Sequence, residues 1–244
     1  MTAITPPLPP LYDKQPSAAA DGVSIGGKAP DQHQEDTEQG QARFGGFWRQ
    51  PQYEAAYVQA ARVLVAHGQV SGTLDEIALP ALFLQRHALE LRLKVLLGMV
   101  FDIGKLKCGV HPTKDQKKLL DTNHWIEKLL KQLECSCAEF DLPPPPHQLI
   151  EFCKALAAIE TDPFMARYPD FQQAGKATHR FVDEVVIPIA KLQAQLEKTV
   201  SATSYMHDGE GDAPYGEVLH AIWHTYFSHA EHEADSVDGT PAAN

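Results

Sequence analysis

The longest apolar stretch of the chain also carries charged side chains. Residues 80 to 101 have the sequence PALFLQRHALELRLKVLLGMVF, and most of these positions are apolar. A run of this length and composition predicts a helix that is buried on nearly all sides. At about 100° per residue, four of its polar residues fall within one sector of roughly 100°. This polar stripe along a predicted core helix consists of Arg86, His87, Glu90 and Lys94.

The polar stripe has two interpretations that the sequence leaves open. Buried charges are costly unless each has a partner, and Glu90 is spaced i,i+4 from both Arg86 and Lys94. In the first interpretation these residues form a neutralised ion network that fixes the register of the helix. In the second they form the floor of a polar cleft that holds a phosphate or a base.

Helical periodicity recurs along most of the chain, and strand-like alternation is not visible. The predicted helices cover residues 47–70, 80–104, 121–133, 147–160, 178–201 and 215–234. The fifth of them contains Pro188, where we expect a kink. The predicted fold class is all-α, an up-and-down four-helix bundle with a C-terminal accessory helix and disordered ends.

The spacing of apolar residues also predicts which helix faces are buried. The first helix should bury the stripe Tyr53, Ala56, Tyr57, Ala60, Val63 and Leu64. The third, with Thr122 or Asn123 as its N-cap, should bury Trp125, Ile126, Leu129, Leu130 and Leu133.

Composition and charge divide the chain into three parts. Residues 1–42 are rich in Pro, Gly and Asp and hold few bulky apolar side chains, which predicts a disordered tail. Residues 43–206 form the predicted bundle, and residues 207–244 form an acidic, His-rich helix and tail. The first part holds six acids against two lysines, and the last holds eight acids and neither Lys nor Arg. The net charge of -11 therefore belongs to the ends and does not exclude an anionic ligand on the bundle.

Cysteine spacing and hydropathy predict the location of the protein. The four cysteines form no CxxC pair, and no charged segment followed by an apolar one stands at the N-terminus, which favours a reduced, cytoplasmic protein. The apolar run of residues 80–101 holds too many charges for a membrane helix, so no membrane association is expected.

One group of residues near the C-terminus has the spacing of a metal site. Glu217, His220 and His224 share a helix face, and such a set can hold zinc. The opposite face is apolar, so the same residues are also what a solvent-facing side would show. We predict no metal and no cofactor.

Three segments in a fixed order resemble a known superfamily. They are RHALELRLKVLL at residues 86–97, NHWIEKLLKQL at 123–133, and ARYPD at 166–170 before a predicted amphipathic helix. Together they resemble the HEPN (higher eukaryote and prokaryote nucleotide-binding) domain superfamily, over roughly residues 50 to 200. The resemblance implies a small helical bundle that forms a homodimer and acts in bacterial defence or toxin-antitoxin systems, in some cases beside a nucleotidyltransferase partner.

Many members of that superfamily are metal-independent ribonucleases with an Arg-x4-6-His motif near the start of the last bundle helix. In this chain Arg167 occupies that region, but the next histidine is His179, twelve residues on. The literal match is Arg62 with His67, on the first predicted helix. These two positions lie about 140° apart on a helix, so they share a face only if the helix ends near Ala66. They are secondary candidates.

The residues of the polar stripe, with two from elsewhere, form the main candidate site. RNA cleavage needs a base for the 2′-hydroxyl proton, which suits neutral His, and a cation for the phosphate, which suits Arg best. The resemblance implies that its topology brings these groups around one cleft. The candidates are His87 and His124 as catalytic bases, Arg86, Lys94 and Arg167 as phosphate-binding groups, and Glu90 as the orienting carboxylate.

A basic segment precedes the third predicted helix. Residues 105 to 118 hold five lysines against one acid, Asp115. Such lysines either face solvent or follow a phosphodiester backbone. Trp125 would add a stacking surface only if it were exposed, and its place on the apolar stripe predicts that it is buried.

The sequence therefore supports two hypotheses for function. In the first, a HEPN-like protein binds or acts on RNA or nucleotides, with metal-independent endoribonuclease activity as one form of that role. In the second, the chain is a non-catalytic interaction module that binds or neutralises a nucleotidyltransferase or another defence protein, encoded by a neighbouring gene.

Overall fold

In the computed structural model, the described residues are 17–18, 24–25, 37–42, 53–159, 166, 170–173, 176–179, 183–206 and 211–238. They fall into two compact units, residues 1–52 and 53–244. Most of the tail that the sequence predicts to be disordered lies outside the described residues. The second unit contains all the helices discussed below.

The described part of the second unit is mainly helical, as predicted. Its helices are α2 (Tyr53–Ser71), α3 (Leu74–Cys108), α4 (Lys114–Thr122), α5 (Ile126–Glu139), α6 (His147–Ala157), α7 (Ile189–Ala202) and α8 (Tyr215–Asp238). Two short antiparallel strand pairs were not predicted: β1 (Ser17–Ala18) with β2 (Ser24–Ile25), and β3 (Asp170–Gln173) with β4 (Lys176–His179).

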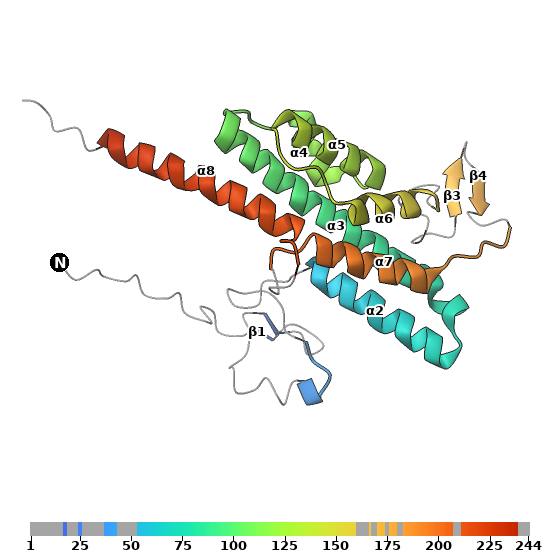
Figure 1. Ribbon diagram of the computed structural model, residues 1–244. Helices are drawn as coiled ribbons and strands as arrows, with labels where there is room; N and C mark the ends of the chain where they lie inside the picture. The colour runs from blue at the N-terminus through green and yellow to red at the C-terminus, as the bar shows by residue number, and fades with distance from the viewer. Residues whose placement is uncertain are drawn as a thin grey trace, which may run out of the picture. The chain divides into compact units, whose positions relative to one another are not determined.

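Helix α3 is the centre of the unit. It is 35 residues long, and α2, α5, α7 and α8 all pack against it (Figure 1). Its side chains Leu89, Leu93, Leu96 and Leu97 are fully buried, which confirms a helix that is buried on most sides. Helix α3 begins six residues before Pro80 and ends at Gly109, whose φ of 67° suits a residue without a Cβ.

The predicted helix over residues 178–201 is wrong in its first half. Residues 176–179 form strand β4, residues 183–188 are not helical, and α7 begins directly after Pro188. Proline lacks an N–H and disfavours helical backbone in the residue before it. The β-branched residues Val185 and Val186 add to that preference, so Pro188 starts the helix instead of bending it.

The segment between α3 and α5 is more ordered than the sequence suggests. Helix α3 continues past Gly104 to Cys108, and the basic segment forms α4 behind a capping box of Thr113 and Gln116. Helix α5 starts at Ile126, five residues later than predicted. Asn123 is not its N-cap; the side chain of Asn123 accepts a hydrogen bond from the backbone N–H of Trp125.

Helix α2 buries a different face from the predicted one. Tyr53 and Val63 are exposed, while Val58, Ala61, Val65 and Gly68 are buried. The buried side is the one with small residues: a Cβ at Gly68 would lie 2.4 Å from the side chain of Ile77 on α3. The close approach of α2 to α3 at Gly68 goes with this face, and of the predicted stripe Tyr57 and Leu64 are only partly buried against the core.

The first turns of helix α8 pack against the rest of the compact unit. Tyr215 and Leu219 are buried against the core, and Gly216 allows the backbone oxygen of Thr203 to come within 2.4 Å of where a Cβ would stand. Figure 1 shows α8 (red) leaving the bundle towards its C-terminal end. Within the described residues, no helix combines the length and apolar character needed to span a bilayer.

Two glycines of α3 give a matched test of this packing. A Cβ at Gly104 would lie 2.4 Å from the ring of the buried Phe140, whereas a Cβ at Gly98 would meet nothing within 4 Å. We expect Gly104→Ala to lower the free energy of unfolding by about 1–3 kcal/mol through overpacking. Gly98→Ala should raise it by about 0.5–1 kcal/mol, because alanine favours a helix.

Urea denaturation of both variants measures the difference. Equal stability of the two alanine variants would contradict the placement of Phe140 over Gly104.

Candidate functional site

The predicted polar stripe is a network centred on the carboxylate of Glu90. This side chain is 2% exposed, and it accepts hydrogen bonds from Nη1 of Arg86 at 2.8 Å and from Nζ of Lys94 at 3.0 Å. Nδ1 of His124 lies 2.9 Å from its Oε1. Because an ionised carboxylate only accepts, His124 donates from Nδ1.

The network joins two separate parts of the chain. Arg86, Glu90 and Lys94 follow one another at one-turn intervals on α3, and His124 lies in the three-residue connection between α4 and α5. Nη2 of Arg86 also donates to the backbone oxygen of His124. The connection is thus held to α3 both by its side chain and by its backbone.

The charge of Glu90 depends on these partners. Burial alone raises the pKa of its carboxyl, but contacts with His87, Lys94, His124 and Arg86 lower it by more. The pKa therefore lies well below its ordinary value of 4.5. Glu90 is ionised at neutral pH in spite of being buried.

His87 lies at the edge of this network, with its ring packed between two aromatic side chains. Its Nδ1 is 3.9 Å from Oε2 of Glu90. The ring meets Tyr57 edge-on at 4.5 Å between centroids and stacks on Phe83 at 5.6 Å. His87 is half-buried, so its ring is held mainly by packing.

The secondary candidates Arg62 and His67 are not brought to this network. Arg167 lies outside the described residues. Arg62 is exposed on α2, where its Nε pairs with Glu197 on α7 at 2.7 Å. Helix α2 continues unbroken past His67 to Ser71, so Arg62 and His67 stay about 140° apart and share no face.

Trp125 is the residue that sequence reasoning placed wrongly. It was predicted to be buried on the stripe of the third helix, but it is 39% exposed. Because α5 begins at Ile126, Trp125 has extended backbone (φ −82°, ψ 112°) and its side chain leaves the helical stripe. Nζ of Lys128 lies 5.4 Å from the centre of its ring, within the range of a cation–π contact.

The lysines around Trp125 divide into engaged and solvent-facing ones. Lys107 donates to the backbone oxygens of Phe140 and Asp141. Lys114, Lys117 and Lys118 on α4 are all exposed. Helix α4 therefore presents three lysines, together with the exposed Asp115 and Asp121, directly before the connection that carries His124 and Trp125.

A second buried ion pair was not predicted from the sequence. Nη2 of Arg92 on α3 lies 2.6 Å from Oε1 of Glu54 on α2, and its guanidinium lies 5.7 Å from the ring centre of Tyr205. Burial raises the pKa of Glu54, and the attraction of Arg92 opposes that shift. The sequence feature that could have predicted this pair is Arg92, a permanent charge in a helix that is otherwise buried.

The zinc-like set on the last helix is not assembled as a metal site. Among the described residues, no group of three His, Cys, Asp or Glu side chains could hold a metal ion. His220 stacks on Trp223 at 6.0 Å between centroids instead, and the backbone N–H of Glu217 donates to Ser204.

The site thus has a buried part and a surface part. Inside, Arg86 and Glu90 neutralise each other and fix a loop. At the surface, the partly exposed His124 stands beside the exposed Trp125 and the lysines of α4. The surface part has the groups that could meet an anionic, aromatic ligand.

Comparisons with known proteins identify no relative. No protein-family model matches the chain, and searches among curated proteins and among solved structures find no match either. The HEPN resemblance therefore stays a prediction.

Replacement of Glu90 tests the network. Glu90→Gln leaves Arg86 and Lys94 without their anion, and breaking a buried pair in this way should cost about 3–5 kcal/mol of unfolding free energy at pH 7. Because the folded-state pKa of Glu90 is lowered, its contribution is present above the ordinary value of 4.5 and is lost as pH falls below it. The difference between wild type and variant should therefore shrink in acid.

Urea denaturation between pH 3 and pH 7 measures this difference. Glu151→Gln is the control, since Glu151 is exposed on α6 and should change stability by less than about 0.5 kcal/mol. A difference for Glu90→Gln that is small or independent of pH would show that the carboxylate is not held in its ionised form.

Proposed function

We propose that this protein is a HEPN-like module that binds single-stranded RNA or a nucleotide at the surface around Trp125, and that it does not cut its ligand. The observation that carries the proposal is the exposed indole of Trp125, with Lys128 against it and His124 as its chain neighbour. An exposed tryptophan beside cations is the arrangement on which bases stack while phosphates are neutralised.

The stacking part of the proposal rests on how Trp125 is held. Its backbone N–H is fixed by Asn123, and the preceding residue is tied to α3 by Glu90 and Arg86. A base that stacks on such a held ring loses little free energy in ordering the protein. Stacking of one base contributes about 1–3 kcal/mol.

The phosphate part rests on α4 and the start of α5. Lys114, Lys117 and Lys118 are exposed within a span of five residues, and α4 ends four residues before Ile126. No side chain caps the start of α5, so its first N–H groups contribute positive potential beside Trp125, which the carboxylate of Glu127 in the first turn partly offsets. Several weak cationic contacts of this kind suit a phosphodiester chain.

Binding is favoured over cleavage because the predicted phosphate clamp and one of the two predicted bases are already engaged. Arg86 is buried and donates to Glu90 and to the backbone of His124, so a phosphate would have to displace those bonds. The ring of His87 lies between aromatic side chains, whereas the bond from Nδ1 of His124 to Glu90 would itself be compatible with a base at Nε2. A defence or toxin-antitoxin setting and homodimer formation are the parts of the proposal that follow from the resemblance alone.

Substitution of Trp125 tests the binding surface. We expect Trp125→Ala to weaken binding of a fluorescein-labelled 12-nucleotide RNA by about 10- to 100-fold, through the loss of one stacked base. Fluorescence anisotropy gives the dissociation constants. Trp223→Ala, on α8, is the matched control and should leave RNA binding unchanged.

The same assay separates the competing functions. Lys117→Ala with Lys118→Ala should reduce the salt dependence of binding by a slope of about 0.7 for each lost phosphate contact. Binding that is equal in the Trp125 and Trp223 variants would overturn the assignment of the surface. RNA that is cut in EDTA by the wild type, and is not cut by His124→Ala, would establish the ribonuclease instead.

A further inference from the structure

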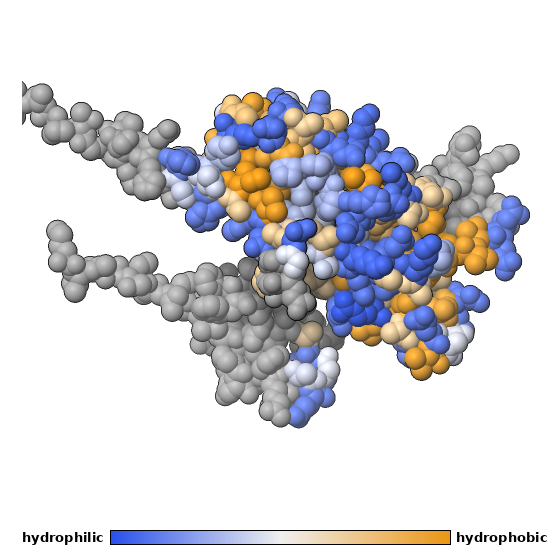
Figure 2. Space-filling model, in the orientation of Figure 1, coloured by the Kyte–Doolittle hydropathy of each residue, from blue (hydrophilic) through white to orange (hydrophobic). Residues whose placement is uncertain are grey.

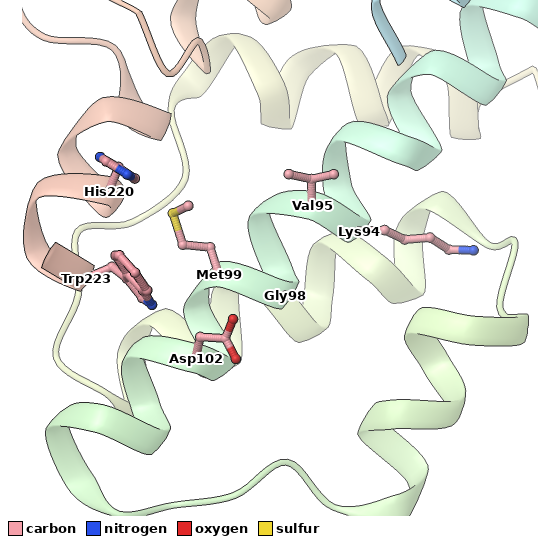
Figure 3. Close-up of a pocket in the computed structure, with 7 residues that line it drawn as sticks. All are labelled: Lys94, Val95, Gly98, Met99, Asp102, His220 and Trp223. Atoms are coloured by element: carbon pink, nitrogen blue, oxygen red, sulfur yellow. The ribbon is translucent and has the colours of Figure 1, made fainter. Parts of the chain in front are cut away.

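A groove lies between α3 and α8, on residues that the RNA-binding proposal does not use. Its volume is about 430 Å³. Figure 3 shows Met99 of α3 facing Trp223 of α8, with His220 above, and the carboxylate of Asp102 on the side away from Trp223. The lining residues are Lys94, Val95, Gly98, Met99, Asp102, His220 and Trp223.

No contact within the described chain requires a glycine at position 98. Each of the three other helical glycines that the structure describes has a close neighbour where its Cβ would be: Ile77 at Gly68, Phe140 at Gly104, and backbone at Gly216. At Gly98 nothing lies within 4 Å. Glycine inside a helix costs about 1 kcal/mol relative to alanine, and here no internal contact offsets that cost. The space over Gly98 opens into the groove.

The apolar stripe of α8 continues past the part that the core covers. Tyr215 and Leu219 are buried, whereas Trp223 is half-buried and Phe227 is exposed. The rings of Trp223 and Phe227 stack on each other at 4.8 Å between centroids. Figure 2 shows apolar surface (orange) over the C-terminal half of α3, beside α8. One side of the groove is therefore an aromatic wall, and its floor is a helix without a side chain at Gly98.

We propose that this groove binds a basic amphipathic helix of a partner protein. An amphipathic helix places apolar residues at i, i+3, i+4 and i+7 into such a groove and leaves its charged residues on the flanks. Gly98 lets the helix approach α3 closely, and Val95, Met99 and Trp223 contact its apolar face.

The charges in and near the groove favour a basic helix as the ligand. Lys94 is paired with Glu90, while Asp102 has no ion-pair partner among the described residues, so the groove presents a carboxylate. By sequence, α8 carries five acids and neither Lys nor Arg, four of the acids between residues 231 and 238. A second copy of the chain would bring the same acids and a net charge of -11 against them. Lysines and arginines on the flanks of a foreign helix would meet opposite charge instead.

The test uses three labelled synthetic 18-residue peptides and the full-length protein. The first carries leucines at i, i+3, i+4 and i+7 with lysines elsewhere, the second replaces its lysines with glutamates, and the third scrambles the first. By fluorescence anisotropy, we expect saturable binding of the first peptide, at least tenfold tighter than that of either other peptide. Gly98→Leu, which fills the groove, and Asp102→Lys should each weaken binding at least tenfold.

Controls keep the test independent of folding and of the RNA surface. Gly98→Leu adds a side chain to open space, so its circular dichroism should match the wild type and its unfolding midpoint should be no lower, because leucine favours a helix more than glycine does. Trp125→Ala should bind the first peptide normally. Equal binding of the scrambled peptide, or binding unaffected by Gly98→Leu, would overturn the proposal. So would a dimer, seen by sedimentation velocity, that Gly98→Leu abolishes, because a second copy would then be the occupant.

Discussion

The buried negative charge of Glu90 is the constraint on which the rest of the structure depends. A carboxylate inside a helix that contacts four others is tolerated only when it is fully paired. Two of its partners are supplied locally by α3, at four residues on either side. His87 of α3 lies 3.9 Å from the carboxylate, and His124 reaches it from the connection between α4 and α5, which is thereby held to α3. Helix α5 begins two residues after His124, and Trp125 between them lies at the surface.

The interior and the surface of the protein therefore have different roles. The ion pairs of the interior, Arg86 with Glu90 and Arg92 with Glu54, hold separate segments together. The surface carries the groups that can meet other molecules, namely an exposed indole beside lysines at one place and an aromatic groove at another. Lys94 borders both regions, since it binds Glu90 while its side chain lines the groove. A buried ion network here supports binding surfaces without itself being one.

Much of this arrangement was predictable from local sequence. The apolar length of residues 80–101 predicts the central helix, and i,i+4 spacing predicts the pairing of Glu90 with Arg86 and Lys94. Effects that depend on distant contacts were not predictable: the buried face of α2 follows from its close approach to Ile77, and the pairing of Glu54 with Arg92 joins residues 38 positions apart. Trp125 was misplaced because α5 begins at Ile126 and not at residue 121, so a predicted stripe position lies just outside the helix and is exposed.

A double-mutant cycle of Arg86→Met and Glu90→Leu tests the central claim most directly. If the two charges hold each other and the connection that carries His124, the double variant should lose less unfolding free energy than the two single variants together, by about 0.5–3 kcal/mol. The folded double variant should also bind labelled RNA more weakly than the wild type, because the backbone next to Trp125 is no longer tied to α3. Additive losses of stability, or a folded double variant that binds RNA as the wild type does, would contradict the account.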